Sequence, residues 1–482
     1  MQTKKVGKLY LHIAIAAVIY LVLKFLIPAT NGLTPIGVNV ISIFIPILYL
    51  WLTVGTDWTC ILALALIIFS GALTSGAVYS GSLGSALIFT VIGMMAFSKV
   101  LVDTGVIETT VRWAITREIV RNRPYVFIAL VLSVCGLISL FMDVSAVALV
   151  FIAIITVICD EIGYKKGDAF FTAMMLGVFW ISNAFNGGSP LGHALPLIMM
   201  NTAAAGGFEI SYAQWMSVGI PAAALISAIC IVFICFIWKP EASKFCNYDL
   251  DAAREKVKPL TKHGIIALVL LAIVVLYWIL PTIFPNMLPE NIKTLYVTYG
   301  STMPLLIAMC LLCVIHVDGT PVANFREMTS SSTIATLLFI GTVMVLGSAV
   351  SSADAGISIW LSTILEPVTS GMSTFALVAV ATLGCIILTN FISNTVCMVV
   401  FYSLTVPLVA ASGTSPIGLI IVLCLTACFA SLVPSAAVTA PFFFGNDNIT
   451  VKNSMKWNII VILTVWAATA FIIYPFSTLI LG

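Results

Sequence analysis

Stretches of about 20 apolar residues recur along the whole chain, and a helix of that length crosses a bilayer core about 30 Å thick. The first stretch covers residues 9–29 and the last covers residues 456–481. Only 8% of the 482 residues are charged, whereas soluble proteins carry about 25%. No polar segment is long enough to form a sizeable soluble domain. The sequence therefore predicts an all-α polytopic membrane protein.

Two pairs of apolar segments follow one another without a loop between them. The first pair meets at Met142–Asp143 and the second pair meets at Ile392–Ser393. Two apolar halves joined at a polar kink predict a hairpin that enters the membrane and leaves it by the same side. With both pairs counted as re-entrant hairpins, the remaining apolar segments give about 11 transmembrane helices.

Two further apolar segments, 169–202 and 416–445, are too long for a simple crossing and contain helix breakers. The breakers are the runs Asn186-Gly187-Gly188-Ser189-Pro190 and Pro434-Ser435-Ala436. Backbone that is not helical is tolerated at membrane depth only where protein or a water-filled cavity surrounds it. These segments therefore predict two broken helices that line a site inside the protein.

Lys and Arg set the expected orientation, because cytoplasmic loops are enriched in them. With the N-terminus inside and both hairpins re-entrant, most of the 21 basic residues fall on the cytoplasmic side. The N-terminal apolar run follows Lys4, Lys5 and Lys8 but lacks a cleavage pattern, so we interpret it as a retained span. We expect a multi-pass protein of the plasma (inner) membrane with a cytoplasmic N-terminus.

The chain also contains an internal repeat. The stretch "SLFMDVSAV" (139–147) matches "TNFISNTVC" (389–397), with Ser145 opposite Thr395, and each stretch precedes a broken helix. The first hairpin is expected to enter from inside and the second from outside, which is the pattern of inverted-topology repeats with a site near the bilayer midplane. The expected parts are an N-terminal membrane helix (1–35), a first repeat with its hairpin tip near 143 (36–238), a cytoplasmic linker (239–262) and a second repeat with its tip near 393 (263–482).

Each hairpin tip is a candidate binding site. A new helix begins there, and its first N–H groups lack intrahelical partners and carry a partial positive charge. Ser393, Asn394 and Thr395 can bond those N–H groups or donate to a ligand, while the carbonyl groups that end the other leg suit a cation. A polar cap on a re-entrant turn is the alternative interpretation. The presence of two related hairpins, each followed by a broken helix, favours a binding site.

The motifs resemble those of the divalent anion:sodium symporter family. The resemblance rests on "ISNTV" at 392–396, on "LVPSAAVTAPFFFG" at 432–445 and on the Gly187-Gly188 pair. Members of that family carry dicarboxylates, citrate or sulfate, and they are homodimers. By resemblance we expect a homodimer that binds Na⁺ as a coupling ion and a small anionic substrate.

The resemblance also implies site residues. One cation site would involve Ser139, Asp143, Val144 and the backbone near Ala194. The other would involve Thr389, Ile392, Asn394 and the backbone near Ala437. The substrate would lie between Ser145, Asn394 and Thr395, with Gly188, Val438 and Thr439 behind it.

The first hairpin departs from the family motif, because Asp143-Val144-Ser145 stands where the family has Ser-Asn-Thr. An acidic residue at membrane depth is a candidate functional residue by default. Asp143 is interpreted as a Na⁺ ligand, as a proton carrier or as a neutral structural acid. An ionised Asp143 without a cation beside it would repel a dianion, so a monocarboxylate, an amino acid or a small neutral solute also becomes credible. His193 is a second candidate for proton coupling.

The leading hypothesis is a secondary-active symporter that couples Na⁺, in preference to H⁺, to transport of a small organic anion such as a di- or monocarboxylate. Alternating access would be of the elevator type, in which the hairpin-containing parts move against a fixed scaffold. The alternatives are a transporter of an amino acid or neutral solute with proton coupling through Asp143, and a channel. We expect no enzyme, because the sequence holds no H-E-x-x-H, G-x-S-x-G or P-loop motif. We expect no nucleic-acid partner.

Overall fold

The fold is almost entirely helical in the part of the chain that the computed structural model describes. That part comprises residues 2–191, 193–255, 257–283, 289, 294, 298–300, 302–330, 332–357, 359–360, 363–364, 371–433, 436–437, 439–444 and 449–481. Among these residues the strands form one antiparallel pair, β1 (His316–Val317) and β2 (Thr320–Pro321). The predicted all-α class is confirmed.

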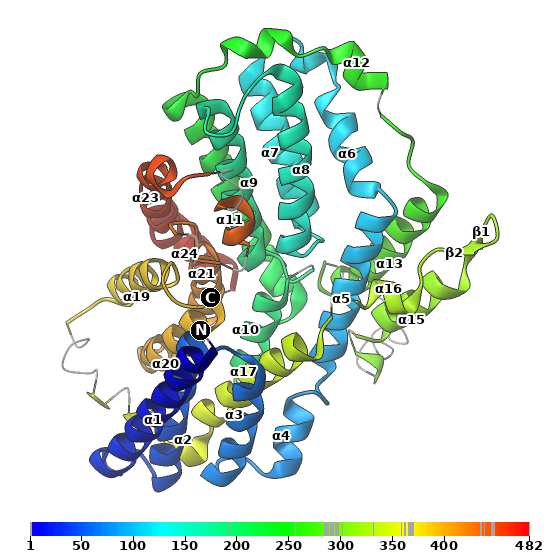
Figure 1. The fold of residues 1–482 in the computed structure, drawn as a ribbon. Coiled ribbons are helices and arrows are strands. Elements are labelled where there is room, and N and C mark those ends of the chain that lie inside the picture. The colour runs from blue at the N-terminus through cyan, green and yellow to red at the C-terminus, as the bar shows by residue number, and fades with distance from the viewer. Residues whose placement is uncertain are drawn as a thin grey trace.

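The first half of the chain forms helices on both sides of the first hairpin (Figure 1). The helices are α1 (Gln2–Leu26), α2 (Pro35–Thr53), α3 (Asp57–Ser70), α4 (Ser75–Gly81), α5 (Ala86–Asp103), α6 (Val106–Ile115), η1 (Glu118–Val120), α7 (Pro124–Ser139), α8 (Val144–Ile162), α9 (Ala169–Gly188), α10 (Ala194–Ala205), α11 (Tyr212–Val232) and η2 (Phe233–Trp238).

The second half repeats the order of hairpin and broken helix. Its helices are η3 (Ser243–Asn247), α12 (Leu250–Glu255), α13 (Lys262–Ile283), α15 (Met303–Val314), α16 (Phe325–Met328), α17 (Ile334–Ser351), η4 (Ala353–Ala355), α19 (Thr374–Leu388), α20 (Asn394–Ala411), α21 (Ile417–Cys428), α22 (Ala440–Phe444), α23 (Val451–Ala468), η6 (Thr469–Ile473) and α24 (Tyr474–Leu481).

Seven helices in the described part are long and apolar enough to span a membrane. Further apolar helices, such as α7, α10, α19 and α21, are shorter. They are short because each is one leg of a hairpin or one half of a broken helix. The chain is thus a multi-pass membrane protein, although in its described part fewer helices are of full spanning length than the predicted 11 or so transmembrane helices.

Both predicted hairpins form, and each wraps around one helix. α7 and α8 pack against each other and both contact α9. The two hairpin helices run side by side in Figure 1. α19 and α20 pack against each other in the same way, and both contact α21. α9 and α21 also pack against each other, so the two hairpins are connected through this pair of helices.

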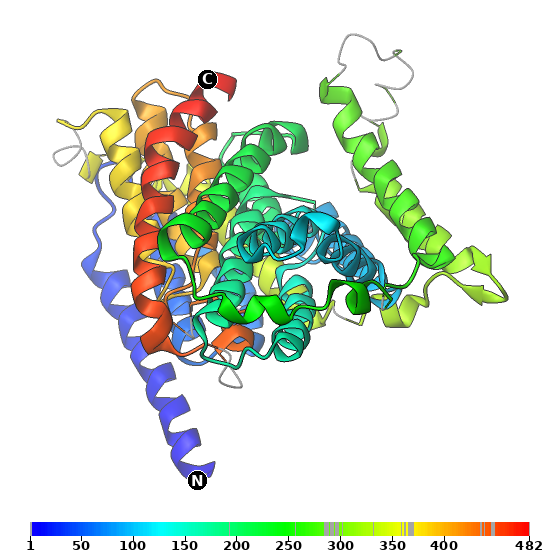
Figure 2. The ribbon, with the colours of Figure 1, turned by 90° about the horizontal axis from the view of Figure 1, so that it is seen from above.

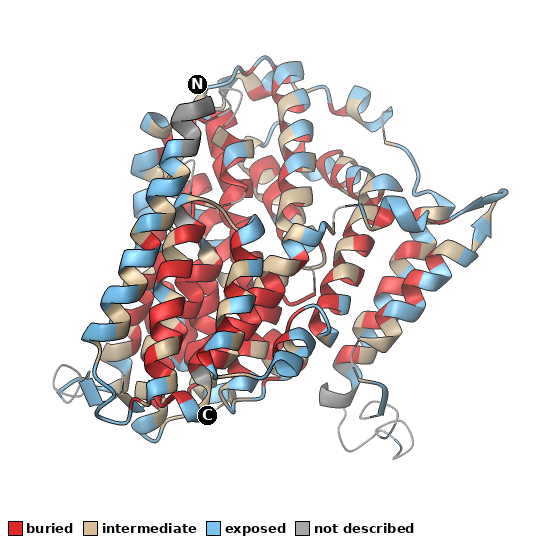
Figure 3. Cartoon of the chain, turned by 60° about the horizontal axis from the view of Figure 1, so that its bottom comes forward, coloured by how far each residue is buried: buried red, intermediate tan, exposed pale blue. Residues whose placement is uncertain are grey.

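Burial separates the centre of the protein from its edge. In α9, 94% of the apolar span is buried, whereas in α1 only 6% of the span is buried. Figure 3 shows the same contrast, with buried residues gathered in the inner helices and α1 largely exposed. α13 and α15 stand at one edge in Figure 2, where they pack on α5. α9 therefore lies in the interior of the protein, whereas the hairpin helices α8 and α20 have only 44% and 50% of their spans buried.

The predicted cytoplasmic linker holds η3 and α12, which are tied to the loop after α6 by ion pairs. Arg121 pairs with Asp251 at 3.1 Å, and Arg254 pairs with Glu118 at 2.8 Å. The guanidinium groups of Arg121 and Arg254 hold the pKa of the Glu118 carboxyl below its usual value. The linker thus packs against the first repeat instead of hanging free between the two halves.

Candidate functional site

The tip of the first hairpin is closed by Asp143. Its carboxylate caps α8 by accepting a hydrogen bond from the Ser145 N–H at 2.9 Å. Its own N–H donates to Ser98 Oγ of α5 at 3.2 Å. Asp143 and Ser145 are both half-buried. Val144 begins α8, and its part in the first cation site stays a prediction.

The first broken helix is bonded to this tip. His193 Nε2 donates to the Ser139 carbonyl at 2.7 Å, and the Ser189 hydroxyl donates to the Leu140 carbonyl at 2.6 Å. Because a carbonyl can only accept, His193 carries its proton on Nε2 here, and its buried Nδ1 has no protein partner among the described residues. Ser139 therefore lies close to the start of α10 at Ala194, as the first predicted cation site requires.

At the tip of the second hairpin, three oxygen atoms come together. The Thr389 hydroxyl lies 3.0 Å from Asn394 Oδ1 and also bonds the Ala427 carbonyl. One hydroxyl has one proton and can satisfy only one of these two acceptors fully. Ala427 lies in the last turn of α21, where carbonyl groups lack intrahelical donors. The arrangement suits a cation held by oxygen ligands at a helix end.

The N-terminus of α20 remains open toward this oxygen cluster. Ser393 occupies the N-cap position, yet its side chain makes no capping hydrogen bond, in contrast to Asp143 at the first tip. Ser393 is exposed and Asn394 is half-buried. The first N–H groups of α20 are thus available to an anion.

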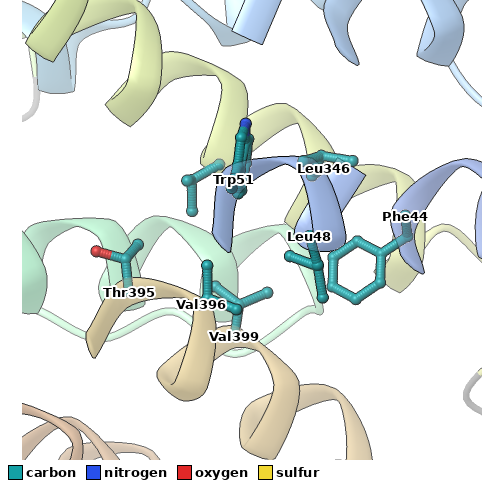
Figure 4. Close-up of a pocket in the computed structure, with 8 residues that line it drawn as sticks. Phe44, Leu48, Trp51, Leu346, Thr395, Val396 and Val399 are labelled. Carbon is teal, nitrogen blue, oxygen red and sulfur yellow. The ribbon is translucent and has the colours of Figure 1, made fainter. Parts of the chain in front are cut away.

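Thr395 of the second hairpin faces α2 and α17. It lines a small cavity whose other walls are apolar side chains of α2, α17 and α20 (Figure 4). In Figure 4 the hydroxyl oxygen of Thr395 points away from Leu48 and Phe44. The hydroxyl is therefore turned away from the apolar contact between α20 and α2.

The second broken helix contributes Ala437 and Thr439. Thr439 is buried, and its Oγ1 has no protein partner among the described residues. Ala437 is half-buried just before α22. Val438, the other predicted substrate residue in this stretch, lies outside the described residues, and so do Pro434 and Ser435. Ile392 is half-buried at the hairpin turn, where its N–H bonds the Leu388 carbonyl at 3.1 Å.

Both predicted helix breaks are present, but neither begins where its predicted run begins. α9 stays helical through Gly187 and ends at Gly188, with Ser189 as its C-cap residue. Gly188 lies against the backbone of α11, where an added Cβ would come within 2.6 Å of the Gly219 carbonyl oxygen. The missing side chain at Gly188 therefore allows α9 and α11 to pack closely. α21 ends at Cys428, before the predicted break at Pro434. Substrate binding by Gly188 stays a prediction.

The structure joins each hairpin to the opposite broken helix. α8 packs on α22, and α20 packs on α10. Sequence reasoning missed Ser98 and Ala427, since one lies far away in sequence and the other takes part through its backbone carbonyl. No local pattern marks either residue.

Comparison with known proteins agrees with this geometry. The citrate transporter family, CitMHS, matches residues 43–401. The chain is 22% identical over 477 residues to the sodium-dependent dicarboxylate transporter SdcS of Staphylococcus saprophyticus, covering 94% of this chain and 89% of that protein. It is 20% identical over 336 residues to an uncharacterized transporter of Haemophilus influenzae, covering 70% and 69% of the two chains.

Two solved transporter structures share the fold. The YdaH transporter of Alcanivorax borkumensis aligns with a TM-score of 0.57 at 12% identity, over 82% of this chain and 86% of that one. MtrF of Neisseria gonorrhoeae, described as one of a class of antimetabolite efflux pumps, aligns with a TM-score of 0.53 at 12% identity, over 85% and 84%. The chain therefore belongs to the citrate transporter family, and it is a membrane transporter and not an enzyme.

Proposed function

We propose that this protein is a secondary-active symporter that couples Na⁺ to the transport of a small carboxylate. The observation that carries the proposal is the oxygen cluster of Thr389, Asn394 and Ala427 beside the uncapped start of α20. A cation among these oxygens would strengthen the positive end of the helix, so that cation and anion binding would support each other. The sodium dependence named for the staphylococcal relative points the same way.

The proposed mechanism is alternating access of the elevator type between inverted repeats. In each half of the chain the two helices of a hairpin pack on the first half of a broken helix, and each hairpin contacts the far half of the other broken helix. This reciprocity is what two related halves of opposite orientation would produce. Under the proposal the hairpins are re-entrant, the N-terminus is cytoplasmic in the plasma membrane, and the protein works as a homodimer.

A second candidate is transport of an amino acid or a neutral solute with proton coupling through Asp143. The observation that favours it is the carboxylate of Asp143 at the α8 N-terminus, because this carboxylate occupies the position that a substrate carboxylate would take. An ionised Asp143 would repel a dicarboxylate, and a Na⁺ bound beside Asp143 would remove this repulsion.

Uptake into proteoliposomes tests the proposal. Radiolabelled citrate, succinate and lactate are each offered with an inward Na⁺ gradient, with choline in place of Na⁺, and with a proton gradient alone. Accumulation above the external concentration that requires Na⁺ supports the symporter. Accumulation driven by protons without Na⁺ supports the second candidate, and flux that only equilibrates in every condition identifies a channel or uniporter.

A further inference from the structure

The backbone at the break after α21 is held by three buried asparagine side chains. Asn183 of α9 donates from Nδ2 to the Ala430 carbonyl at 2.9 Å. Asn458 of α23 donates from Nδ2 to the Ser431 carbonyl at 2.8 Å. Asn390, next to Thr389 at the second hairpin tip, accepts on Oδ1 from the N–H groups of the two residues after Ala430, at 2.9 and 2.8 Å.

These bonds replace the ones that a continuous helix would have made. α21 ends at Cys428, and Phe429 already leaves the helical conformation with ψ near 60°. Inside a membrane no bulk water is present to bond the freed backbone groups. The amides of three separate elements supply four of those bonds, and all three side chains are at most 1% exposed.

Two of the three asparagines are themselves held in one orientation, whereas the buried Oδ1 of Asn183 has no partner among the described residues. Asn390 Nδ2 donates to the Ile386 carbonyl at 2.7 Å, which fixes Oδ1 toward the break. Asn458 Oδ1 accepts from the indole N–H of Trp180 at 2.8 Å, which fixes Nδ2 toward Ser431. An amide side chain whose N–H donor and oxygen acceptor are both hydrogen-bonded has a fixed orientation, and it can therefore fix the position of the backbone group that it bonds.

The clamped stretch lies directly beside the candidate cation site. Ala427 is one turn before Ala430, and its carbonyl bonds the hydroxyl of Thr389. Asn390 follows Thr389 in the chain, so one side of the clamp and one cation-site residue share the same hairpin turn. Any shift of the break relative to that turn would change the separation of the oxygens.

We propose that Asn183, Asn390 and Asn458 act together as an asparagine clamp, which positions the Ala427 carbonyl for Na⁺ binding. The three residues are positioning residues, because they bond the break and not the cation. The inference rests on the proposed function, since it assigns to the clamp an effect on the affinity of the Na⁺ site. The inference also implies that α9 and α23, which carry Asn183 and Asn458, belong to the same rigid unit as the second hairpin.

The test measures Na⁺ binding in the purified full chain without a substrate. The unfolding temperature is followed as NaCl replaces choline chloride at constant ionic strength, and the midpoint of stabilisation gives the apparent Na⁺ affinity. The variants are Asn390→Leu and Asn458→Leu, which remove clamp bonds from two different elements. The matched control is Asn201→Leu, because Asn201 Nδ2 bonds only the Leu197 carbonyl of its own helix.

We expect the Na⁺ midpoint to rise about tenfold in both clamp variants and to stay within about twofold in the control. A purely structural clamp would lower the unfolding temperature in choline but leave the midpoint of the Na⁺ titration in place. That outcome, in folded Asn390→Leu and Asn458→Leu, overturns the inference.

Trp180→Phe keeps the test decisive if the leucine variants do not fold. It leaves every backbone bond of the clamp, removes the indole N–H that orients Asn458, and shortens a fully buried side chain. We expect a smaller rise in the Na⁺ midpoint, of about threefold, and an unchanged midpoint would again refute the clamp. A wild-type protein that Na⁺ does not stabilise would overturn the proposed Na⁺ coupling, and the clamp with it. A wild-type response with unaltered variants overturns the clamp alone.

Discussion

Replacing Thr389 by Val tests the oxygen cluster at the second hairpin tip. Valine has the same shape as threonine but lacks the hydroxyl that bonds the Ala427 carbonyl and lies 3.0 Å from Asn394 Oδ1. Thr389 is fully buried, so water cannot take the place of the lost donor. The change therefore removes one oxygen from the cluster and leaves two others facing each other.

The size of the effect follows from those contacts. A buried acceptor left without a donor costs roughly 1–3 kcal/mol of folding free energy, and a bond to a charged partner is worth about 1.5–3 kcal/mol. If Na⁺ binds the hydroxyl oxygen, a loss of about 1.5–3 kcal/mol weakens Na⁺ binding by roughly 10- to 100-fold, since every 1.4 kcal/mol is a factor of ten. Thr389→Val should thus be destabilised in choline and also respond to Na⁺ only at much higher concentration.

The assay combines the Na⁺ titration of unfolding temperature with uptake into proteoliposomes at several Na⁺ concentrations. Thr405→Val is the matched control, because among the described residues the Thr405 hydroxyl on α20 bonds only the Phe401 carbonyl one turn earlier, at 2.6 Å. The reasoning fails if Thr389→Val folds and keeps both its Na⁺ midpoint and its Na⁺-dependent uptake at wild-type values. It fails equally if Thr405→Val changes them as much.

Three further outcomes are expected. Asp143→Ser should fold, because serine is also a good N-cap. Its uptake of dicarboxylates relative to monocarboxylates should increase. If the substrate range, the Na⁺ dependence and the pH dependence all stay unchanged, Asp143 is structural. Gly188→Ala should lower the unfolding temperature, because the new methyl group meets the Gly219 carbonyl at 2.6 Å, and a wild-type value would contradict that contact. The Asp168 carboxylate is bonded by the Lys244 ammonium group and by the Lys165 N–H, and these bonds keep its pKa below the usual value. The stabilisation of the folded state by this ionised carboxylate is therefore present at neutral pH and is lost as the pH falls through the lowered pKa. Asp168→Asn should therefore flatten the acid end of the stability profile and leave the region from pH 6 to 8 with little slope, and an unaltered acid limb would contradict the ion pair.

The hairpins could be predicted from sequence because their signal is local. Each tip has a polar kink between two apolar halves, and the structure starts α8 directly after Asp143 and α20 directly after Ser393. The contact between Thr389 and Asn394 is also local, since both belong to one turn. The carbonyl of Ala427 could not be predicted, because every residue has a carbonyl group and only the fold selects one.

The sequence predicts that both helices are broken but not the residue at which each break begins, because distant residues decide that position. Pro434 suggested a break that in fact begins at Phe429. The chain can leave the helix this early because amides of α9, α19–α20 and α23 bond the freed backbone groups. In the other direction, Gly188 remains helical although a Gly-Gly pair weakens a helix, because its lack of a side chain allows α11 to approach.

The two hairpin tips differ in charge although they are built alike, and this difference bears on the substrate. At α8 the Asp143 carboxylate already bonds the Ser145 N–H and lowers the positive potential of that helix end. At α20 the Ser393 side chain leaves the corresponding N–H groups open. A dianion shared between the tips would be attracted at α20 and repelled at α8 unless a cation lay beside Asp143. Under the proposed function the anionic end of a substrate would therefore lie at α20, and Na⁺ bound near Asp143 would decide whether a second carboxylate is accepted.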